Sequence, residues 1–307
     1  MMWRVGNGVR GSRASAAPDD PAAVAAVRAH PRFAEALRMS AAGLVELYQG
    51  GHLLNWLIDD RGRMLFGYFA LYLHVTYDRA DPSSGLIPTR MRRLVTELGI
   101  CSPGRAPAML SLMRFGGYLT PAVEVVDRRQ GRLLATDKLF ALLEARWRLH
   151  FGAMAPLFDD GEAMLRALDD PGVRRALMIA MAERFLAGFR IATHAPQLGL
   201  FGERNAGLLI FSSLMVAGEP DDTVPPARPV PISIAGLARR FAVSRPHVIK
   251  LFRDAEGQGL IARRGDRVEI KPPLADGARD FFAALYLFFA ACAREALVAR
   301  GQTRKAG

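Results

Sequence analysis

Four basic residues in the second half of the chain are spaced so that they could lie on one face of a helix. They fall on one side of a helix if the apolar residues between them, Val248, Leu251 and Phe252, face a core. Guanidinium and ammonium groups held in this way donate hydrogen bonds to phosphate oxygens and to base edges. The spacing therefore predicts contact with a nucleic acid through Arg245, His247, Lys250 and Arg253.

Two short amphipathic helices, separated by a tight turn, would position these side chains. Each is indicated by apolar residues at positions i, i+3, i+4 and i+7. Ser233 and Ser244 stand where N-caps are expected, and Pro246 lies in an opening turn, where its missing N–H costs nothing. The turn Ala242-Val243 has room only for a helix-turn-helix. The apolar sets are Ile234, Leu237, Ala238 and Phe241 in the first helix and Val248, Leu251, Phe252 and Ala255 in the second.

A strand, a tight turn and a second strand are predicted after these helices, at residues 260–263, 264–266 and 267–270. In this order the elements resemble a winged helix-turn-helix, and the two-stranded wing is similar to those of the MarR-type bacterial regulators. The resemblance covers about forty residues and implies that DNA is contacted by the second helix, from Ser244 onward, and by the wing. Similar spacing also occurs in helical cores, and some winged helices bind only proteins, but the charge pattern favours DNA. The basic residues of the wing are Arg263, Arg264 and Arg267.

The chain repeats this motif in its first half. Thr89 stands where the earlier first helix needs a cap, and Ser102 corresponds to Ser244. A second wing is predicted from strands at residues 123–126 and 133–135 around a turn at 127–132, whose tip carries Arg128, Arg129 and Arg132. The repeat therefore predicts two helix-turn-helix motifs in the chain instead of one. The matching apolar residues are Met91, Leu94, Val95 and Leu98, 143 positions earlier, and Ala106, Met109, Leu110 and Met113, 142 positions earlier.

Longer helices flank each copy of the motif. A helix pair precedes each copy, and a long apolar helix follows it, which is the order of a MarR-like protomer. The resemblance thus implies a mainly α fold with small β-wings, in which tandem winged helix-turn-helix domains have interlocking flanking helices. It also implies a single-chain pseudo-dimer that acts as a monomer. The helix pairs are predicted at 33–58 with 64–75 and at 173–191 with 205–216, and the long helices at 139–158 and 278–298.

The domain boundaries follow from this repeat and from composition. The first copy is placed at residues 28–158 and the second at 173–300. Residues 1–27, rich in Gly, Ser, Ala, Pro and Arg, are expected to form a flexible basic arm. Residues 159–172 are expected to be a linker, and residues 301–307 a tail.

The two copies offer different side chains to a nucleic acid. Where the second copy carries its four basic residues, aligned positions in the first carry Pro103, Arg105, Ala108 and Ser111. The second copy is therefore expected to read bases, while the first positions itself on phosphates. A fused pair of this kind could recognise an asymmetric operator. The candidate contacts of the first copy are Arg90, Arg92, Arg93, Ser102, Arg105 and Ser111, together with the three arginines of its wing.

Charge and cysteine content agree with these expectations. The formal net charge is +11, and residues 86–138 and 232–271 each hold nine basic against four acidic residues, a net charge of +5 in each segment. Concentrated positive charge suits a polyanion. Two cysteines give no disulfide framework, and an unreactive thiol is favoured over a redox sensor at Cys101. With no apparent signal peptide and a longest apolar run of thirteen residues, at 281–293, the protein is expected to be cytoplasmic, without membrane contact.

The sequence offers little for catalysis. No P-loop, H-E-x-x-H, paired C-x-x-C or G-x-S-x-G is present, and the G-x-G-x-x-G at residues 6–11 lacks its strand and helix. Paired aspartates lie at expected helix boundaries or loops, where capping explains them. No enzyme activity, cofactor or metal site is therefore expected. The aromatic residues of 281–289 are expected to pack between the copies, and the resemblance allows a small-molecule effector without naming its site.

The resulting expectation is a sequence-specific, double-stranded DNA-binding transcriptional regulator. Two alternatives remain open. One is a plasmid- or phage-type replication initiator with tandem winged helices, which would bind tandem repeats instead of one operator. The other is a winged-helix scaffold that assembles proteins without reading sequence, which would show little DNA binding or no sequence preference.

Overall fold

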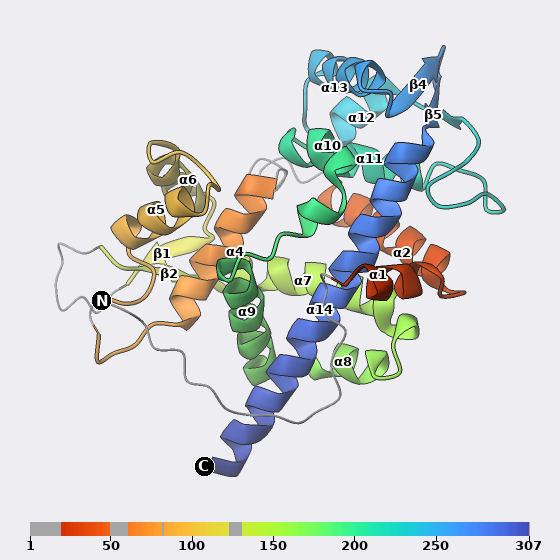
Figure 1. The fold of residues 1–307 in the computed structure, drawn as a ribbon. Coiled ribbons are helices and arrows are strands. Elements are labelled where there is room, and N and C mark those ends of the chain that lie inside the picture. Colours follow the sequence, from red (N-terminus) through yellow and green to blue (C-terminus); the bar gives the residue numbers. More distant parts are fainter. Residues whose placement is uncertain (1–19, 50–60, 82, 123–130, 307) are drawn as a thin grey trace.

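Helices account for most of the chain, as the apolar spacing predicts, and the strands form two small antiparallel sheets (Figure 1). The computed structural model describes residues 20–49, 61–81, 83–122 and 131–306. The helices up to residue 170 are α1 (Pro21–Arg28), α2 (Phe33–Tyr48), α4 (Arg61–Val75), α5 (Pro88–Glu97), α6 (Arg105–Phe115), α7 (Asp137–Met154), η1 (Ala155–Leu157) and α8 (Gly161–Ala167). Those that follow are α9 (Pro171–Leu186), η2 (Ile191–His194), η3 (Pro196–Leu198), α10 (Gly199–Glu203), α11 (Gly207–Met215), α12 (Ile234–Arg240), α13 (Arg245–Gly257) and α14 (Pro272–Ala306).

Two helix-hairpin units occupy the positions of the repeated motif. The first unit consists of α5, α6 and the pair β1 (Leu119–Pro121) and β2 (Leu133–Ala135). The second unit consists of α12, α13, β4 (Ile261–Arg264) and β5 (Arg267–Ile270), with β3 (Val230–Pro231) added in the order β3-β5-β4. Strand β3 was not among the predicted elements.

Capping differs between the two units. The Ser233 hydroxyl accepts the N–H of Gly236 at 3.0 Å, and the Ser244 hydroxyl accepts the N–H of His247 at 3.2 Å, which confirms both caps. The cap expected at Thr89 is wrong, because α5 begins at Pro88 and Ile87 is its N-cap.

The cap expected at Ser102 is wrong for a similar reason. Helix α6 begins three residues later, at Arg105, and only the backbone carbonyl of Ser102 is engaged, by the N–H of Arg105 at 3.0 Å. The later start places Pro107 in the first turn of α6, where the backbone N–H needs no intrahelical partner. The proline therefore does not break the helix.

The hairpins follow the predicted pattern where they are described. The second hairpin turns at Gly265, which has a φ of +61° that glycine adopts without strain, and β4 and β5 match the predicted strands to within one residue. In the first hairpin the strand at Leu133–Ala135 is confirmed. Its partner is Leu119–Pro121, and the strand expected at 123–126 lies outside the described residues.

The flanking helices pack reciprocally between the two halves of the chain. Within each half the first long helix packs on the last, α2 on α7 and α9 on α14. Across the halves α11 packs on α2, and α4 packs on α9. Each of these four contacts therefore has a counterpart when the two halves are exchanged.

The aromatic residues of α14 bury themselves against the first half, as expected. The Phe289 ring lies 5.6 Å from the His150 ring and 5.5 Å from the Phe151 ring, both on α7, and Tyr286 packs edge-on against Phe33 of α2. Aromatic rings of this size contribute much of the burial in a core. The hydrophobic core thus runs between the halves.

Three segments expected to lack structure contain helices. In the expected arm, Asp20 caps α1, and Arg28 at its end binds Asp276 and Asp280 of α14, while residues 1–19 lie outside the description. The expected linker contains α8, which Asp160 ties to α14 through Arg294 at 2.7 Å. The expected tail continues α14 as far as residue 306.

Helix α14 runs from the second unit to the opposite end of the molecule (Figure 1). Among the described residues it is the one helix long and apolar enough to cross a membrane by length and composition, over Pro272–Gln302. However, 72% of its apolar window is buried within the protein. The apolar run at 281–293 is therefore the middle of a longer, mostly covered helix.

Candidate nucleic-acid interface

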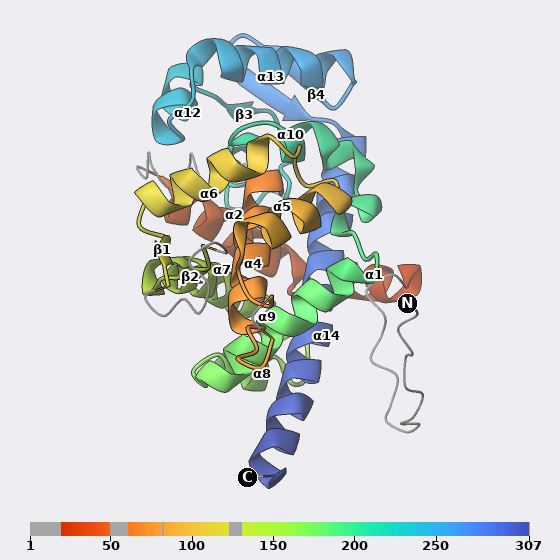
Figure 2. The same cartoon turned by 90° about the vertical axis from the view of Figure 1, so that its left-hand side faces the viewer.

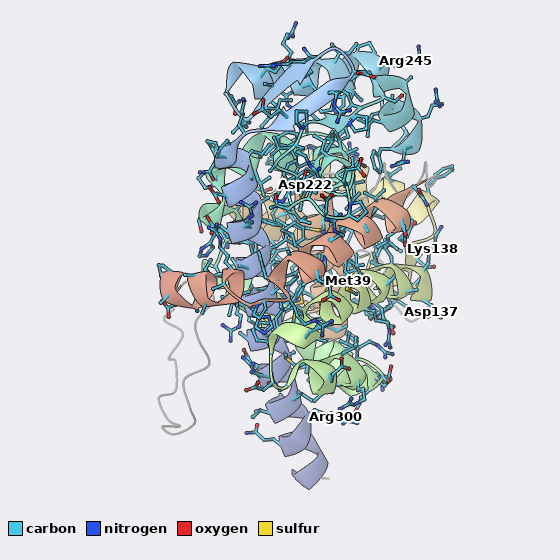
Figure 3. The ribbon with its side chains drawn as sticks, turned by 90° about the vertical axis from the view of Figure 1, so that its right-hand side faces the viewer. Met39, Asp137, Lys138, Asp222, Arg245 and Arg300 are labelled. Carbon is cyan, nitrogen blue, oxygen red and sulfur yellow. The ribbon has the colours of Figure 1, made fainter. Side chains whose placement is uncertain are left out.

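Helix α13 has one apolar side, which is buried, and one basic side, which faces outward. Val248, Leu251, Phe252 and Ala255 are all buried, as the spacing predicts. Arg245, Lys250 and Arg253 are exposed, and Figure 3 shows Arg245 at the outer end of the second unit. Three of the four predicted base-reading residues therefore face solvent.

The fourth residue, His247, does not. Its Nε2–H donates to the backbone carbonyl of Asn205 at 2.9 Å, just before α11, and the side chain is half-buried. The expectation that His247 projects with the three other residues is wrong, because residues 199–207 cover that side of α13. This contact joins positions 42 residues apart, and the local spacing carries no sign of it.

A charge cluster holds α13 on the same support. Arg204, at the end of α10, binds the Asp254 carboxylate at 3.1 Å, and Lys250 approaches that carboxylate at 3.5 Å. The aspartate therefore compensates part of the local positive charge. The contacts of Arg204 and His247 fix the rotation of α13 about its own axis, which decides which side chains face outward.

Of the three basic residues expected on the wing of the second unit, one is held in an ion pair and two are exposed. The Arg263 guanidinium is bound to the Glu256 carboxylate at 2.6 Å, so this residue stabilises the contact between α13 and β4. Arg264 is exposed. Arg267 is also exposed, and one of its guanidinium nitrogens donates to the Pro229 carbonyl.

Three more residues on this surface were not among the predicted contacts. Ile249 is 47% exposed between the basic residues of α13, and an apolar side chain there suits a thymine methyl group. Arg239 and Arg240 are exposed at the end of α12. The sequence carried both signals: Ile249 lies outside the buried spacing, and the paired arginines close the first helix.

The positions of α6 that align with Lys250 and Arg253 of α13 are uncharged. Ala108 and Ser111 are exposed there, and Phe115, further along the helix, is 84% exposed. Arg105 is also exposed, at the start of the helix. This arrangement agrees with the expected inequality of the copies, since α6 has neutral residues where α13 has Lys250 and Arg253.

Arg114 is exposed near the end of α6, and further basic residues of the first unit lie on α5 and in the hairpin. Arg92 and Arg93 are exposed, and Arg93 lies 4.0 Å from Glu97. Arg90 is half-buried, and Arg132 is stacked over the Tyr77 ring at 4.0 Å. Ser102 is exposed before α6, whereas Arg128 and Arg129 lie outside the described residues.

Both units lie in the same upper part of the molecule. Figures 1 and 2 place α6 and α13 there, with α13 above α6 in Figure 2, while α8 and the end of α14 lie at the opposite side. The elements that carry these exposed basic residues, α5, α12 and α13, therefore lie away from α8 and the end of α14.

The other sequence candidates have structural roles. Asp170 caps α9 through the N–H of Gly172, and Asp222 accepts N–H groups from Thr223, Ala227 and Arg228. Burial raises the pKa of the Cys101 thiol, which disfavours a reactive thiolate. Asp59 and Asp60 lie outside the described residues.

Comparison with known proteins gives no relative. No protein-family model, no curated protein and no solved structure matches this chain. The function must therefore be argued from the surface itself.

Proposed function

We propose that this chain is a sequence-specific, double-stranded DNA-binding transcriptional regulator with two winged helix-turn-helix modules. The observation that carries the proposal is the outer side of α13, where Arg245, Lys250 and Arg253 are exposed around Ile249. A helix of this kind fits the major groove, in which guanidinium and ammonium groups bind guanine and an aliphatic group contacts thymine. The exposed Arg264 of the hairpin would add a backbone contact beside it.

The reciprocal packing of the flanking helices supports a pseudo-dimer. The contacts of α2 with α7 and α11 are repeated by α9 with α14 and α4. Two interlocked copies of one plan, joined in a single chain, account for this pattern. They also account for the 143-residue spacing between the units.

The two modules have unequal roles in this proposal. The second reads bases through α13, whereas the first contacts phosphates through Arg92, Arg93 and Arg105. Neutral residues on the outer side of α6 offer few groups for guanine. The binding site is therefore expected to be asymmetric, with stronger sequence preference in one half.

The test begins with genome-wide mapping of the sites that the full-length protein occupies. A recovered site and its scrambled version are then compared by gel shift. Arg245→Ala and Lys250→Ala are each expected to reduce the preference for the true site by ~1–3 kcal/mol. Arg166→Ala, which removes an exposed arginine of α8, is the control and should leave the preference unchanged.

Three outcomes would contradict the proposal. Equal losses on both DNAs would show that α13 does not read bases. Occupancy confined to tandem repeats would favour a replication initiator. Weak binding without preference over a salt titration would favour a protein scaffold.

A further inference from the structure

A cavity of about 400 Å³ lies between the two halves of the chain. Its wall is largely apolar and includes Tyr68 of α4, Phe185 and Phe189 of the second half, and Phe288 and Phe289 of α14. The rings of Phe189 and Phe288 are stacked, with centroids 5.0 Å apart. Cavities of this volume hold small organic molecules, and such a wall fits an apolar or aromatic body.

Arg146 brings a positive charge to this wall, which also contains Glu203 and Arg190. Its guanidinium donates to the Tyr48 hydroxyl at 3.1 Å, and among the described residues no carboxylate forms an ion pair with it. Burial lowers the pKa of Arg146, but the neighbouring Tyr48 and Tyr68 raise it above its ordinary value, so the group stays charged. Arg146 is half-buried, and a partly desolvated charge without a counter-ion among the described residues is costly, so an anion in the cavity would relieve this cost.

His150 lies one turn further along α7 and presents a hydrogen-bond acceptor. Tyr286 donates its hydroxyl proton to the Ala36 carbonyl at 2.9 Å, so it accepts from the Ser40 hydroxyl at 2.7 Å. Ser40 therefore accepts from His150 Nδ1–H at 3.2 Å. Burial, aided by the charge of Arg146, keeps the pKa of His150 well below its ordinary value, so the ring is neutral.

This chain of hydrogen bonds leaves the Nε2 atom of His150 with a lone pair. The residue is 1% exposed, it lines the cavity, and its Nε2 has no hydrogen-bond partner in the described part of the chain. A buried acceptor of this kind requires a donor. The cavity therefore presents a cation and an acceptor side by side, on residues four positions apart in one helix.

Two tyrosine hydroxyls complete the polar end. Tyr48 accepts from Arg146, and Tyr68 accepts from the Trp147 indole N–H at 3.1 Å, so each keeps its own O–H as a donor. Together with the guanidinium they offer three donors to one anionic group. These polar groups come from α2, α4 and α7, and the His150 ring stacks on the Phe289 ring of α14 at 5.6 Å.

We propose that this cavity binds a hydrophobic organic acid that carries a hydroxyl group near its carboxylate. The carboxylate binds Arg146 and the tyrosine hydroxyls, the ligand hydroxyl donates to His150 Nε2, and the apolar body lies among the phenylalanines. This binding site does not depend on the proposed function in DNA binding.

Calorimetry on the full-length, DNA-free protein tests the proposal with two probes, 3-hydroxy-2-naphthoate for an aromatic body and 3-hydroxydecanoate for an aliphatic one. At least one is expected to bind with one molecule per chain. For the naphthalene series, 2-naphthoate and 2-naphthol each lack one polar group and should bind about tenfold more weakly or worse; decanoate and 2-decanol serve the same purpose for the aliphatic series. Failure of both hydroxy acids to bind would overturn the proposal.

Substitutions on α7 separate the two polar contacts. Arg146→Met should weaken the hydroxy acid at least about tenfold and leave the corresponding alcohol unchanged. His150→Phe should remove the difference between the hydroxy acid and the acid that lacks the hydroxyl. Arg166→Met on α8, outside the cavity, is the control and should bind like the unmodified protein.

Thermal unfolding distinguishes ligand binding from a structural role. Arg146→Met removes a partly desolvated charge that has no counter-ion among the described residues, so the ligand-free variant should unfold no earlier than the unmodified protein. A lower unfolding temperature together with unchanged affinity would show that Arg146 serves only the fold. That result would overturn the assignment.

The wall of the cavity also includes residues of segments that pack next to α6 and α13. Gly99 and Ile100, in the turn before α6, belong to its wall, as does Gly202 of α10, which packs against α13. An occupant is therefore expected to change DNA affinity by a measurable factor. This coupling rests on the proposed function, whereas calorimetry measures ligand binding alone, so the two can fail separately.

Discussion

Ser244 and Ser102 occupy aligned positions before α13 and α6, yet only Ser244 forms a capping hydrogen bond. Ser244→Ala should lower the free energy of unfolding by about 1 kcal/mol, because an N–H in the first turn of α13 loses its partner. Urea denaturation followed by circular dichroism measures the change. Ser102→Ala is the matched control and should have almost no effect; equal losses would contradict the described caps.

The Asp222 carboxylate makes the stability of the loop before β3 depend on pH. Burial favours the neutral form, but N–H groups of Arg228, Ala227 and Thr223 and the Arg228 side chain outweigh it and lower the pKa from 3.8 to about 2. Because the folded value is the lower one, the stabilisation is complete above the unfolded pKa and disappears as the pH falls through the folded pKa.

Asp222→Asn is therefore expected to lower stability at pH 7, with a deficit that shrinks below about pH 4. Urea midpoints measured between pH 7 and pH 3 test this. Asp221→Asn, which removes an exposed carboxylate from the same loop, is the control. A deficit for Asp222→Asn that stays constant with pH would rule out the titration of this carboxylate.

Local residue roles were predictable where neighbours in sequence decide them. Ser233 and Ser244 were identified as caps because a capping hydrogen bond spans three residues. His247 was misplaced because its partner, Asn205, lies on a distant segment. The polar pair of the cavity, Arg146 and His150, was missed because the spacing suits an ordinary amphipathic helix.

At the scale of elements, α1 is joined to α14 by a partly buried ion-pair cluster. Arg28 binds Asp276 at 2.9 Å and Asp280 at 2.6 Å. Arg28→Met should lower the free energy of unfolding by roughly 1 kcal/mol, since Asp280 loses this cation and Asp276 keeps only Arg279, at 3.3 Å.

Thermal and urea denaturation of the same variant measure the loss. Arg32→Met is the comparison, because Arg32 pairs only with Glu35 three residues away on the surface and should contribute little. An equal effect of the two substitutions would mean that α1 is not anchored through Arg28.

The long helices were predictable from sequence, whereas the short helices α8 and α10 were not. The apolar periods of α2, α9 and α14 extend over several turns, so the pattern outweighs local irregularities. By contrast, α10 has five residues and α8 has seven, too few to be stable without tertiary contacts. The missed α10 matters most, since it supports α13.

On the scale of the whole molecule, the two halves are expected to fold only together. Helix α11 packs on α2 and α4 packs on α9, so each half completes its core with the other. Residues 1–168 and 169–307 expressed together should co-purify as one complex, while each alone should be unfolded or aggregated. Size-exclusion chromatography and circular dichroism test this, and two independently folded fragments would contradict the interlocked packing.

The presence of two similar helix-hairpin units could be predicted from the sequence. The difference between the outer sides of α6 and α13 could be predicted only in part. Apolar positions repeat at a separation of 143 residues because the core of each unit demands the same spacing. The neutral residues of α6 could be predicted, but the exposure of Phe115 could not, because it depends on what packs beside the helix.

Joining both halves in one polypeptide has a consequence for behaviour at low abundance. Two separate subunits fall apart on dilution, because their association depends on concentration. In this chain the contacts of α11 with α2 and of α4 with α9 form intramolecularly. The fraction of assembled molecules should therefore be the same in a cell that holds a few copies as in one that holds thousands.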